Sequence, residues 1–236
     1  NSIYINGNEI YRPFLIKSGQ QEGLSAISPY MVENIDFSNG GFTAKYGDKM
    51  SSVLDITYKK PEKFESVVSA SLMSADAYIG FGNKKFSWTN SFRYNNNRFL
   101  LNSLQTSGEY RPNFTDYQTY FSYRPNSKWS FDIIGNYNSN HYNFYPKTRE
   151  TTFGTMDNVK SFNVYFDGQE NDIFKTTSAT FGITRQFSPI SSISLIASSF
   201  TSNEKEQYDI QSQYWLTQTE SQENLGVGTF FEHARN

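Results

Sequence analysis

Hydrophobic and polar residues alternate one by one in several segments after residue 85. One series sets Phe86, Trp88, Phe92 and Tyr94 against Ser87, Thr89, Ser91 and Arg93. Similar series run from Tyr117 to Tyr123, Trp129 to Tyr137, Ala179 to Phe187 and Ile193 to Ala197. A period of two predicts β-strands with one apolar face and one polar face.

These series and their neighbours predict about eight strands. We place them near residues 64–73, 76–82, 85–103, 115–124, 128–142, 173–187, 190–204 and 225–236. The connections are alternately short and long. Short turns fall at 82–85, 125–127 and 188–189, and long polar segments at 104–114, 143–172 and 205–224, the second with a further hairpin at Asp167-Gly168.

Strands with one apolar face, joined alternately by short turns and long loops, are typical of a transmembrane antiparallel β-barrel. Tyr117, Trp129 and Phe187 lie near predicted strand ends, where such barrels carry aromatic girdles. A soluble β-sandwich with aromatic faces is the competing interpretation. The predicted strands 85–103 and 190–204 disfavour it, because sandwich strands usually run about 3–10 residues.

The first sixty residues follow a more compact pattern. Asn6-Gly7 between two short apolar pieces predicts a two-residue hairpin, because both residues tolerate a positive φ. Ser28-Pro29 predicts a short helical turn with Ser28 as its cap. Residues 52–58 alternate as a strand, and 59–63 form a polar linker to the longer strands.

Composition narrows the class of protein. The chain has 21 Phe, 17 Tyr and 3 Trp, yet its mean hydropathy is -0.64. No run approaches the roughly 18 apolar residues of a transmembrane helix. A barrel fits both facts, because it needs apolar residues only at alternate positions. The lack of cysteine excludes disulfides and thiolate metal sites, and a net charge of -2 without like-charge blocks gives nucleic-acid binding no support.

Residues 40–47 read Gly-Gly-Phe-Thr-Ala-Lys-Tyr-Gly, and residues 51–56 read Ser-Ser-Val-Leu-Asp-Ile. This plug-to-barrel motif resembles the end of the plug domain in TonB-dependent outer-membrane receptors, particularly those of the Bacteroidetes type. Its residues are Gly40, Gly41, Phe42, Tyr46, Gly47, Ser51, Ser52 and Asp55. Residues 4–10 and 28–35 also look like plug segments of this family, and the rest resembles it in pattern and order only.

The resemblance implies a fold dominated by β-structure. We expect a partial transmembrane antiparallel β-barrel, with about eight of about 22 strands, and a small α+β plug portion. Residues 1–60 would be the C-terminal half of the plug domain, and 61–236 the N-terminal strands and extracellular loops of the barrel. Both ends of the sequence read as strand interiors, so we expect a piece of a longer chain.

The resemblance also implies a function. The protein would bind a nutrient at the surface of a Gram-negative cell and import it through the outer membrane, with no enzymatic activity and no cofactor. The implied partners are outer-membrane lipid, TonB through an N-terminal part, and a surface lipoprotein lid or other complex subunits. Two alternatives stay open: a structural subunit of an outer-membrane assembly or export complex, and a soluble carbohydrate-binding β-sandwich.

Two sets of side chains are candidates for contact with a ligand. The first, in a plug loop, is Tyr11, Arg12, Phe14, Lys17, Gln20, Gln21 and Glu22. The second, in the long loops, is Tyr142, Phe144, Tyr145, Tyr214 and Trp215, because aromatic faces stack on sugars and apolar ligands. The structural alternatives are sealing of the plug against the barrel wall for the first set and interface anchoring for the second.

Catalytic and metal chemistry find little support in the sequence. His141 and His233 lie in unrelated contexts, and the chain has neither a nucleophile elbow nor a paired metal-ligand motif. Asp167, Glu170 and Asp172 form an acidic cluster whose spacing matches no EF-hand.

The alternation also predicts a polar inner face. The side chains that share this face are Ser87, Thr89, Arg93, Thr180 and Gln186. Because a buried charge needs a partner, we expect Arg93 to pair with a plug carboxylate, with Asp55 as the candidate.

Overall fold

The computed structural model describes residues 2–10, 27–41, 44–47, 51–96, 98, 108–155 and 158–219. Within them the protein is almost entirely β-structure. The chain divides into two compact units. The first is Asn1–Asn96, Pro112–His141 and Ile173–Lys205, and the second is Asn97–Arg111, Tyr142–Asp172 and Glu206–Asn236. No helix in the described part is long and apolar enough to cross a membrane.

Four short strands of the first unit form a sheet that we call the small sheet. They are β1 (Ser2–Ile5), β2 (Asn8–Glu9), β3 (Val32–Ser38) and β4 (Val53–Tyr58), in the order β2-β1-β4-β3. β1 pairs parallel with β4, and the other two pairs are antiparallel. The predicted hairpin is confirmed, since Asn6 and Gly7 connect β1 to β2 with φ values of 49° and 81°.

The described part of this region also contains the 3-10 turns η2 (Pro29–Met31) and η3 (Ala44–Tyr46). The predicted turn after Ser28 is confirmed as η2, with Pro29 at its first position. The predicted cap is wrong, because the Ser28 side chain makes no capping hydrogen bond. Its hydroxyl lies 2.6 Å from the Ser91 hydroxyl instead, so Ser28 contacts another sheet rather than its own turn.

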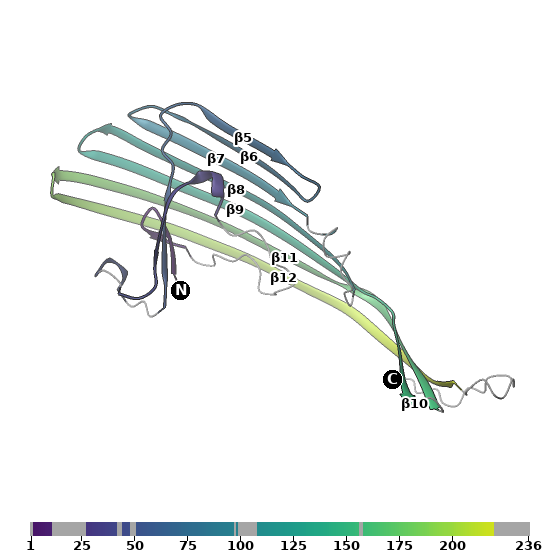
Figure 1. The fold of residues 1–236 in the computed structure, drawn as a ribbon. Coiled ribbons are helices and arrows are strands. Elements are labelled where there is room, and N and C mark those ends of the chain that lie inside the picture. Colours follow the sequence, from purple (N-terminus) through teal and green to yellow (C-terminus); the bar gives the residue numbers. More distant parts are fainter. Residues whose placement is uncertain are drawn as a thin grey trace. The chain divides into compact units, whose positions relative to one another are not determined.

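The remaining strands form an eight-stranded sheet, called here the large sheet (Figure 1). They are β5 (Glu65–Ala70), β6 (Ser74–Gly82), β7 (Phe86–Asn95), β8 (Gly108–Asn126), β9 (Trp129–Pro146), β10 (Arg149–Thr155), β11 (Asn158–Ser188) and β12 (Ser191–Thr219). Their order is β10-β11-β9-β8-β7-β6-β5, and β12 pairs with β11. The large sheet is a curled antiparallel sheet of the kind that forms part of a β-barrel.

Seven of the predicted strands correspond to strands of the large sheet, and the eighth, 225–236, lies outside the described residues. The strand predicted over 85–103 ends at Asn95. Three successive asparagines begin there, and asparagine is depleted in strands because its side chain competes for backbone hydrogen bonds.

The prediction of long loops is wrong for the described parts of these segments. Residues 108–114 belong to β8, 158–172 to β11 and 205–219 to β12. The predicted hairpin at Asp167-Gly168 is wrong too, because the hairpin forms between β10 and β11, where Thr155 pairs with Asn158. Backbone pairing does not depend on side-chain polarity, so the polar composition of these segments does not distinguish a strand from a loop.

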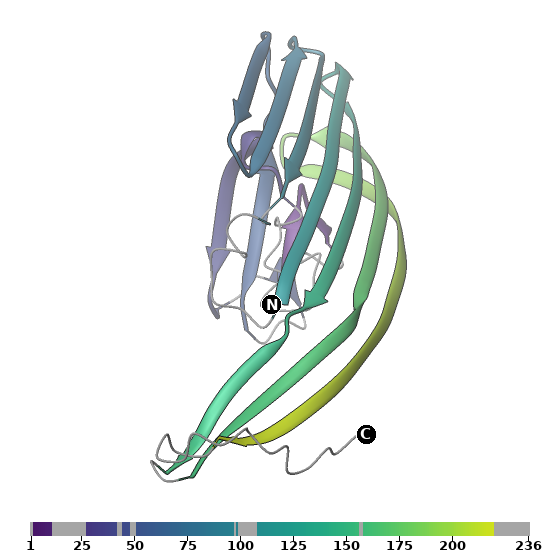
Figure 2. The same ribbon diagram turned by 90° about the vertical axis from the view of Figure 1, so that its right-hand side faces the viewer.

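The strand pair β7–β8 shows how the sequence pattern builds the two faces. Ser87, Thr89, Ser91 and Arg93 are buried on the face that contacts the small sheet, which we call the inner face. Trp88 and Phe92 on the outer face are 41% and 44% exposed. The small sheet lies against the inner face (Figure 2). Both sheets supply one core, formed by Ile5, Met31, Ile56, Tyr58, Tyr78, Tyr120 and Ile134.

Candidate functional site between the two sheets

Ser28 holds the small sheet to one cross-strand pair of the large sheet. Ser91 on β7 and Gln118 on β8 are register partners, so their side chains lie beside each other on the inner face. The backbone N–H of Ser28 donates to Gln118 Oε1 at 3.1 Å, and its hydroxyl lies 2.6 Å from Ser91 Oγ. All three residues are buried, so these hydrogen bonds are shielded from water.

The next cross-strand pair along the same strands is a buried ion pair. Arg93 and Asp116 are register partners, and their side chains are 4% and 3% exposed. Arg93 Nη2 lies 2.7 Å from Asp116 Oδ2, and Arg93 Nε donates to the same oxygen at 2.8 Å. Arg93 Nη1 donates to the backbone carbonyl of Ile27 at 3.0 Å, so the guanidinium also holds the chain next to Ser28.

The inward position predicted for Arg93 is confirmed, but its predicted partner is wrong. Asp55 on β4 binds Lys45 Nζ at 2.7 Å and accepts a hydrogen bond from the Tyr46 hydroxyl. The register of β7 and β8 places a carboxylate directly opposite Arg93, so its charge is neutralised within the large sheet. The hydrogen bond to Asp55 also raises the pKa of Lys45.

Tyr58 is the second point of attachment between the sheets. Its hydroxyl donates to Gln118 Oε1 at 3.0 Å, the oxygen that also accepts from Ser28. Its ring packs edge-on against Tyr120, with 5.9 Å between centroids. Burial raises the pKa of the Tyr58 phenol, and the nearby Asp116 carboxylate adds to the shift. The phenol therefore stays a neutral donor.

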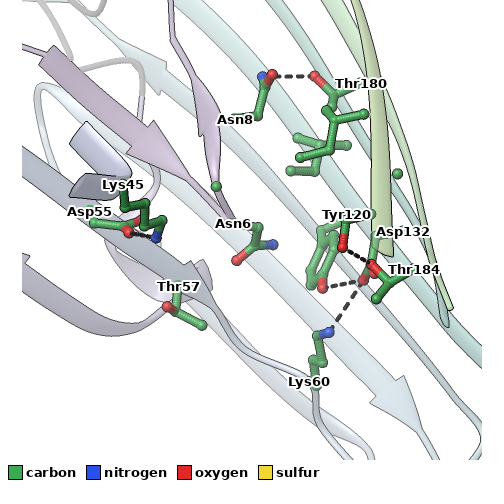
Figure 3. A pocket seen from close by; sticks show the side chains of 15 residues that line it. Asn6, Asn8, Lys45, Asp55, Thr57, Lys60, Tyr120, Asp132, Thr180 and Thr184 are labelled. Carbon is green, nitrogen blue, oxygen red and sulfur yellow. Dashed lines mark hydrogen bonds and ion pairs between the residues drawn. The ribbon is translucent and has the colours of Figure 1, made fainter. Parts of the chain in front are cut away.

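A cavity of about 460 Å³ lies beside this contact (Figure 3). Its lining comes from the β1–β2 hairpin, β4 and the linker on one side and from β8, β9, β11 and β12 on the other. Asn8 Nδ2 bridges the two sides by donating to Thr180 Oγ1 at 2.9 Å. The predicted inward position of Thr180 thus agrees with its contact to the small sheet.

An ion pair lies at the linker end of the cavity. Lys60 Nζ is 3.2 Å from Asp132 Oδ1, which also accepts from the Tyr120 hydroxyl at 2.7 Å (Figure 3). Ser130 Oγ donates to the other carboxylate oxygen at 3.0 Å. Asp132 therefore ties the linker that leaves β4 to the inner face.

The chemistry of the cavity is that of hydrogen bonding. Besides its two ion pairs, Lys60–Asp132 and Lys45–Asp55, it offers amides and hydroxyls, such as those of Asn6 and Thr184. Such a lining suits water or a hydroxylated solute. Among the described residues no cluster of His, Asp and Glu could hold a metal ion, and His141 is exposed on β9.

The predicted ligand-contacting residues fall in two places. Tyr11, Arg12, Phe14, Lys17, Gln20, Gln21 and Glu22 lie outside the described residues. The predicted loop aromatics lie on strands of the second unit: Tyr142, Phe144 and Tyr145 on β9, and Tyr214 and Trp215 on β12.

These aromatics form contacts within the second unit. Tyr110 on β8 lies 6.1 Å from Tyr142 and 4.8 Å from Phe144 between ring centroids. The guanidinium of Arg111 lies 4.7 Å from the Tyr145 ring. Tyr214 contacts Phe162, with 5.7 Å between centroids.

The plug-to-barrel motif surrounds the start of β4. Gly40 and Gly41 have φ values of 88° and 62°, which explains why glycine stands at both. Tyr46 and Asp55 are linked by a hydrogen bond, and the carbonyl of Ser52 accepts from the backbone N–H of Ser2 at 3.0 Å. Phe42 lies outside the described residues.

Sequence reasoning missed Gln118, Asp116 and Asp132 as residues of the contact. The signal was present, because each alternates with outward aromatic residues and so belongs to the inner face. Their partners depend on strand register and on how the two sheets pack, which alternation does not encode.

The geometry defines a curled antiparallel wall with a separate sheet on its polar face. No family model and no curated protein matches the chain. Among solved structures, it is similar to a variant of the ferric enterobactin receptor PfeA from Pseudomonas aeruginosa. That match has 12% identity and a TM-score of 0.41, and it covers 92% of this chain and 41% of that one.

Two further structures are similar to this chain. For the ferripyoverdine receptor of the outer membrane of Pseudomonas aeruginosa, identity is 11%, coverage 97% of this chain and 38% of that chain, and TM-score 0.40. For the siderophore receptor PirA from Acinetobacter baumannii, identity is 12% and the TM-score is 0.38. That match covers 92% of this chain and 40% of that chain. The chain thus spans about two fifths of these receptors.

Proposed function

We propose that this chain belongs to a plugged outer-membrane β-barrel that imports a nutrient, as TonB-dependent receptors do. Residues 1–60 are the C-terminal half of the plug and 61–236 the first strands and extracellular extensions of the wall. The observation that carries the proposal is the attachment of the small sheet, through Ser28 and Tyr58, to buried polar groups of the inner face.

The two faces of the wall support insertion in a membrane. The outer face exposes large apolar side chains such as Trp88, Phe92, Ile133 and Phe181, while the inner face buries charges and amides. Lipid tolerates backbone only where its hydrogen bonds are satisfied, and a closed wall of paired strands meets that demand. A wall wide enough to hold a plug has about 22 strands.

The contact between plug and wall suits controlled passage. Hydrogen bonds and a polar cavity link the two sheets, so a pull on the plug exchanges these bonds for bonds to water. In this proposal TonB supplies the pull through an N-terminal part, and no covalent chemistry is needed. The loop Tyr11–Glu22 and the aromatics of the second unit are the candidate contacts for the nutrient at the cell surface.

Uptake in cells that carry or lack the full-length protein tests the proposal. A panel of scarce nutrients is offered with and without a proton uncoupler. We expect uptake of at least one nutrient to require both the protein and the proton gradient. Stable co-purification with assembly factors, without any such uptake, would instead favour the role of a structural subunit. Recovery from the aqueous phase without detergent would overturn the membrane location.

A further inference from the structure

A continuous row of five side chains crosses the outer face of the large sheet at its short-turn end. We call it the rim row: Phe187 and Arg185 on β11, Trp129 and Phe131 on β9, and Tyr123 on β8. The Arg185 guanidinium lies 4.9 Å from the Phe187 ring and 5.1 Å from the Trp129 ring. Trp129 stacks on Phe131 at 6.2 Å, and Tyr123 stacks on Phe131 at 6.3 Å.

Strand pairing brings these residues together. The backbone N–H of Gln186 donates to the carbonyl of Lys128 at 2.8 Å, so the end of β11 lies beside the β8–β9 turn. Alternation then turns Arg185 and Phe187 to the outer face with Trp129. Phe187 is 53% and Tyr123 40% exposed, so the rim row is an open surface.

Cations outnumber carboxylates at this rim, where Glu62 lies in one hollow with Lys84, Lys85 and Arg124. Neither Arg185 nor Lys128 forms an ion pair with any residue that the structure describes. Segments 82–85, 124–128 and 185–189 hold Lys84, Lys85, Arg124, Lys128 and Arg185, and no Asp or Glu. The rim therefore presents positive charge next to exposed aromatic rings.

We propose that Arg185 binds the phosphate of an anionic glycerophospholipid in the leaflet that faces the short turns. The inference rests on the proposed membrane location. Aromatic rings prefer the headgroup level of a bilayer, which puts Arg185 at the depth of lipid phosphates. Contact with rings uses none of the N–H donors of a guanidinium, and those donors match two phosphate oxygens. Stacking alone would fix the side chain without any preference among lipids.

Fluorescence quenching by brominated lipids measures this preference. The full-length protein carries Trp88→Phe and Trp215→Phe, which leaves Trp129 as the reporter within these 236 residues. It is placed in phosphatidylcholine vesicles with a minority of phosphatidylglycerol, and either lipid is brominated in turn. We expect phosphatidylglycerol to be enriched beside Trp129, and Arg185→Gln to lower the enrichment about fivefold.

The matched control is Lys175→Gln. Lys175 is an exposed cation on the same strand and face, ten positions before Arg185, so the enrichment should persist. Equal loss in both variants, or no loss in Arg185→Gln, would overturn the phosphate site. Quenching by neither lipid would show that the protein is not inserted, and would sink the membrane proposal as well. Quenching by both lipids without preference would contradict the phosphate site and leave the membrane proposal intact.

Discussion

At the scale of single residues, Gln118 has the most demanding role. Its carbonyl oxygen accepts from both attachment points of the small sheet, Ser28 and Tyr58, while its amide donates to Asp116 at 3.0 Å. One side chain thus joins three polar groups: Tyr58 on the small sheet, Ser28 at the turn that leads into it, and Asp116 on β8. An unsatisfied buried donor costs about 1–3 kcal/mol, so the contact depends strongly on this residue.

Gln118→Leu should loosen the small sheet without removing the wall. It leaves the Ser28 N–H and the Tyr58 hydroxyl without their acceptor, at a cost of about 1–3 kcal/mol each. Hydrogen exchange at Ser28–Met31 should therefore become faster. The control is Gln186→Leu, because the Gln186 amide binds the Ser188 carbonyl in its own turn. Equal exchange rates in the two variants would contradict the role of Gln118.

Asp116→Ala should cost about 3–5 kcal/mol of unfolding free energy, because it removes the carboxylate that neutralises the buried Arg93 charge. The double variant Arg93→Met/Asp116→Leu should recover most of that loss, since no charge stays buried. Lys45→Ala, which removes the exposed lysine of its pair with Asp55, should cost less than about 1 kcal/mol. Denaturant unfolding of the detergent-solubilised protein measures all three. If Asp116→Ala cost as little as Lys45→Ala, the assignment of Arg93 and Asp116 as a buried ion pair would be contradicted.

The raised pKa of Tyr58 predicts a loss of stability in alkali. The folded state favours the neutral phenol, so its contribution is complete below the ordinary pKa of about 10 and is lost as pH rises through the higher folded-state pKa. Unfolding midpoints between about pH 9 and pH 11 should fall less in Tyr58→Phe than in the parent protein. Identical slopes would show that Tyr58 is not the titrating group.

At the scale of elements, the β1–β2 hairpin depends on its glycine. Gly7 has a φ of 81°, and no atom lies within 4 Å of the place that a Cβ would occupy, so a substitution there meets backbone strain alone. Gly7→Ala should cost about 1–2 kcal/mol.

The control for the hairpin is Gly47→Ala. Gly47 has equally free space and lacks a left-handed φ, so the change should be neutral or stabilise by about 0.4–1 kcal/mol. Thermal unfolding in detergent compares the two variants. If Gly7→Ala were as stable as Gly47→Ala, the left-handed conformation of Gly7 in the turn would be contradicted.

The elements also show how far the sequence alone could lead. Asn6-Gly7, Ser28-Pro29 and the alternation around Trp88 and Trp129 each encode local geometry, and the corresponding elements were predicted correctly. The extension of β11 and β12 was not predicted, because largely polar sequence between two strands fits a loop as well as a strand, although Tyr208, Ile210, Tyr214 and Leu216 alternate with polar residues in β12.

At the scale of the whole molecule, the candidate site arises only when distant segments meet. Ser28 and Gln118 are 90 positions apart, and Lys60 and Asp132 are 72 apart. Sequence alternation placed Arg93, Ser87 and Thr89 on the inner face correctly. It could not select Asp116 over Asp55 as the partner of Arg93, because that choice follows from the register of β7 against β8.

A cysteine pair at Ser28 and Ser91 tests the seating of the plug on the wall most directly. The two hydroxyl oxygens are 2.6 Å apart, and these 236 residues contain no cysteine. In the full-length protein in outer membranes, Ser28→Cys/Ser91→Cys should form a disulfide under mild oxidation, while the buried thiol of each single variant stays reduced and reacts with maleimide only after unfolding. The disulfide should block nutrient uptake until a reductant is added. Two freely reactive thiols in the folded, membrane-embedded double variant would contradict a small sheet docked on the inner face.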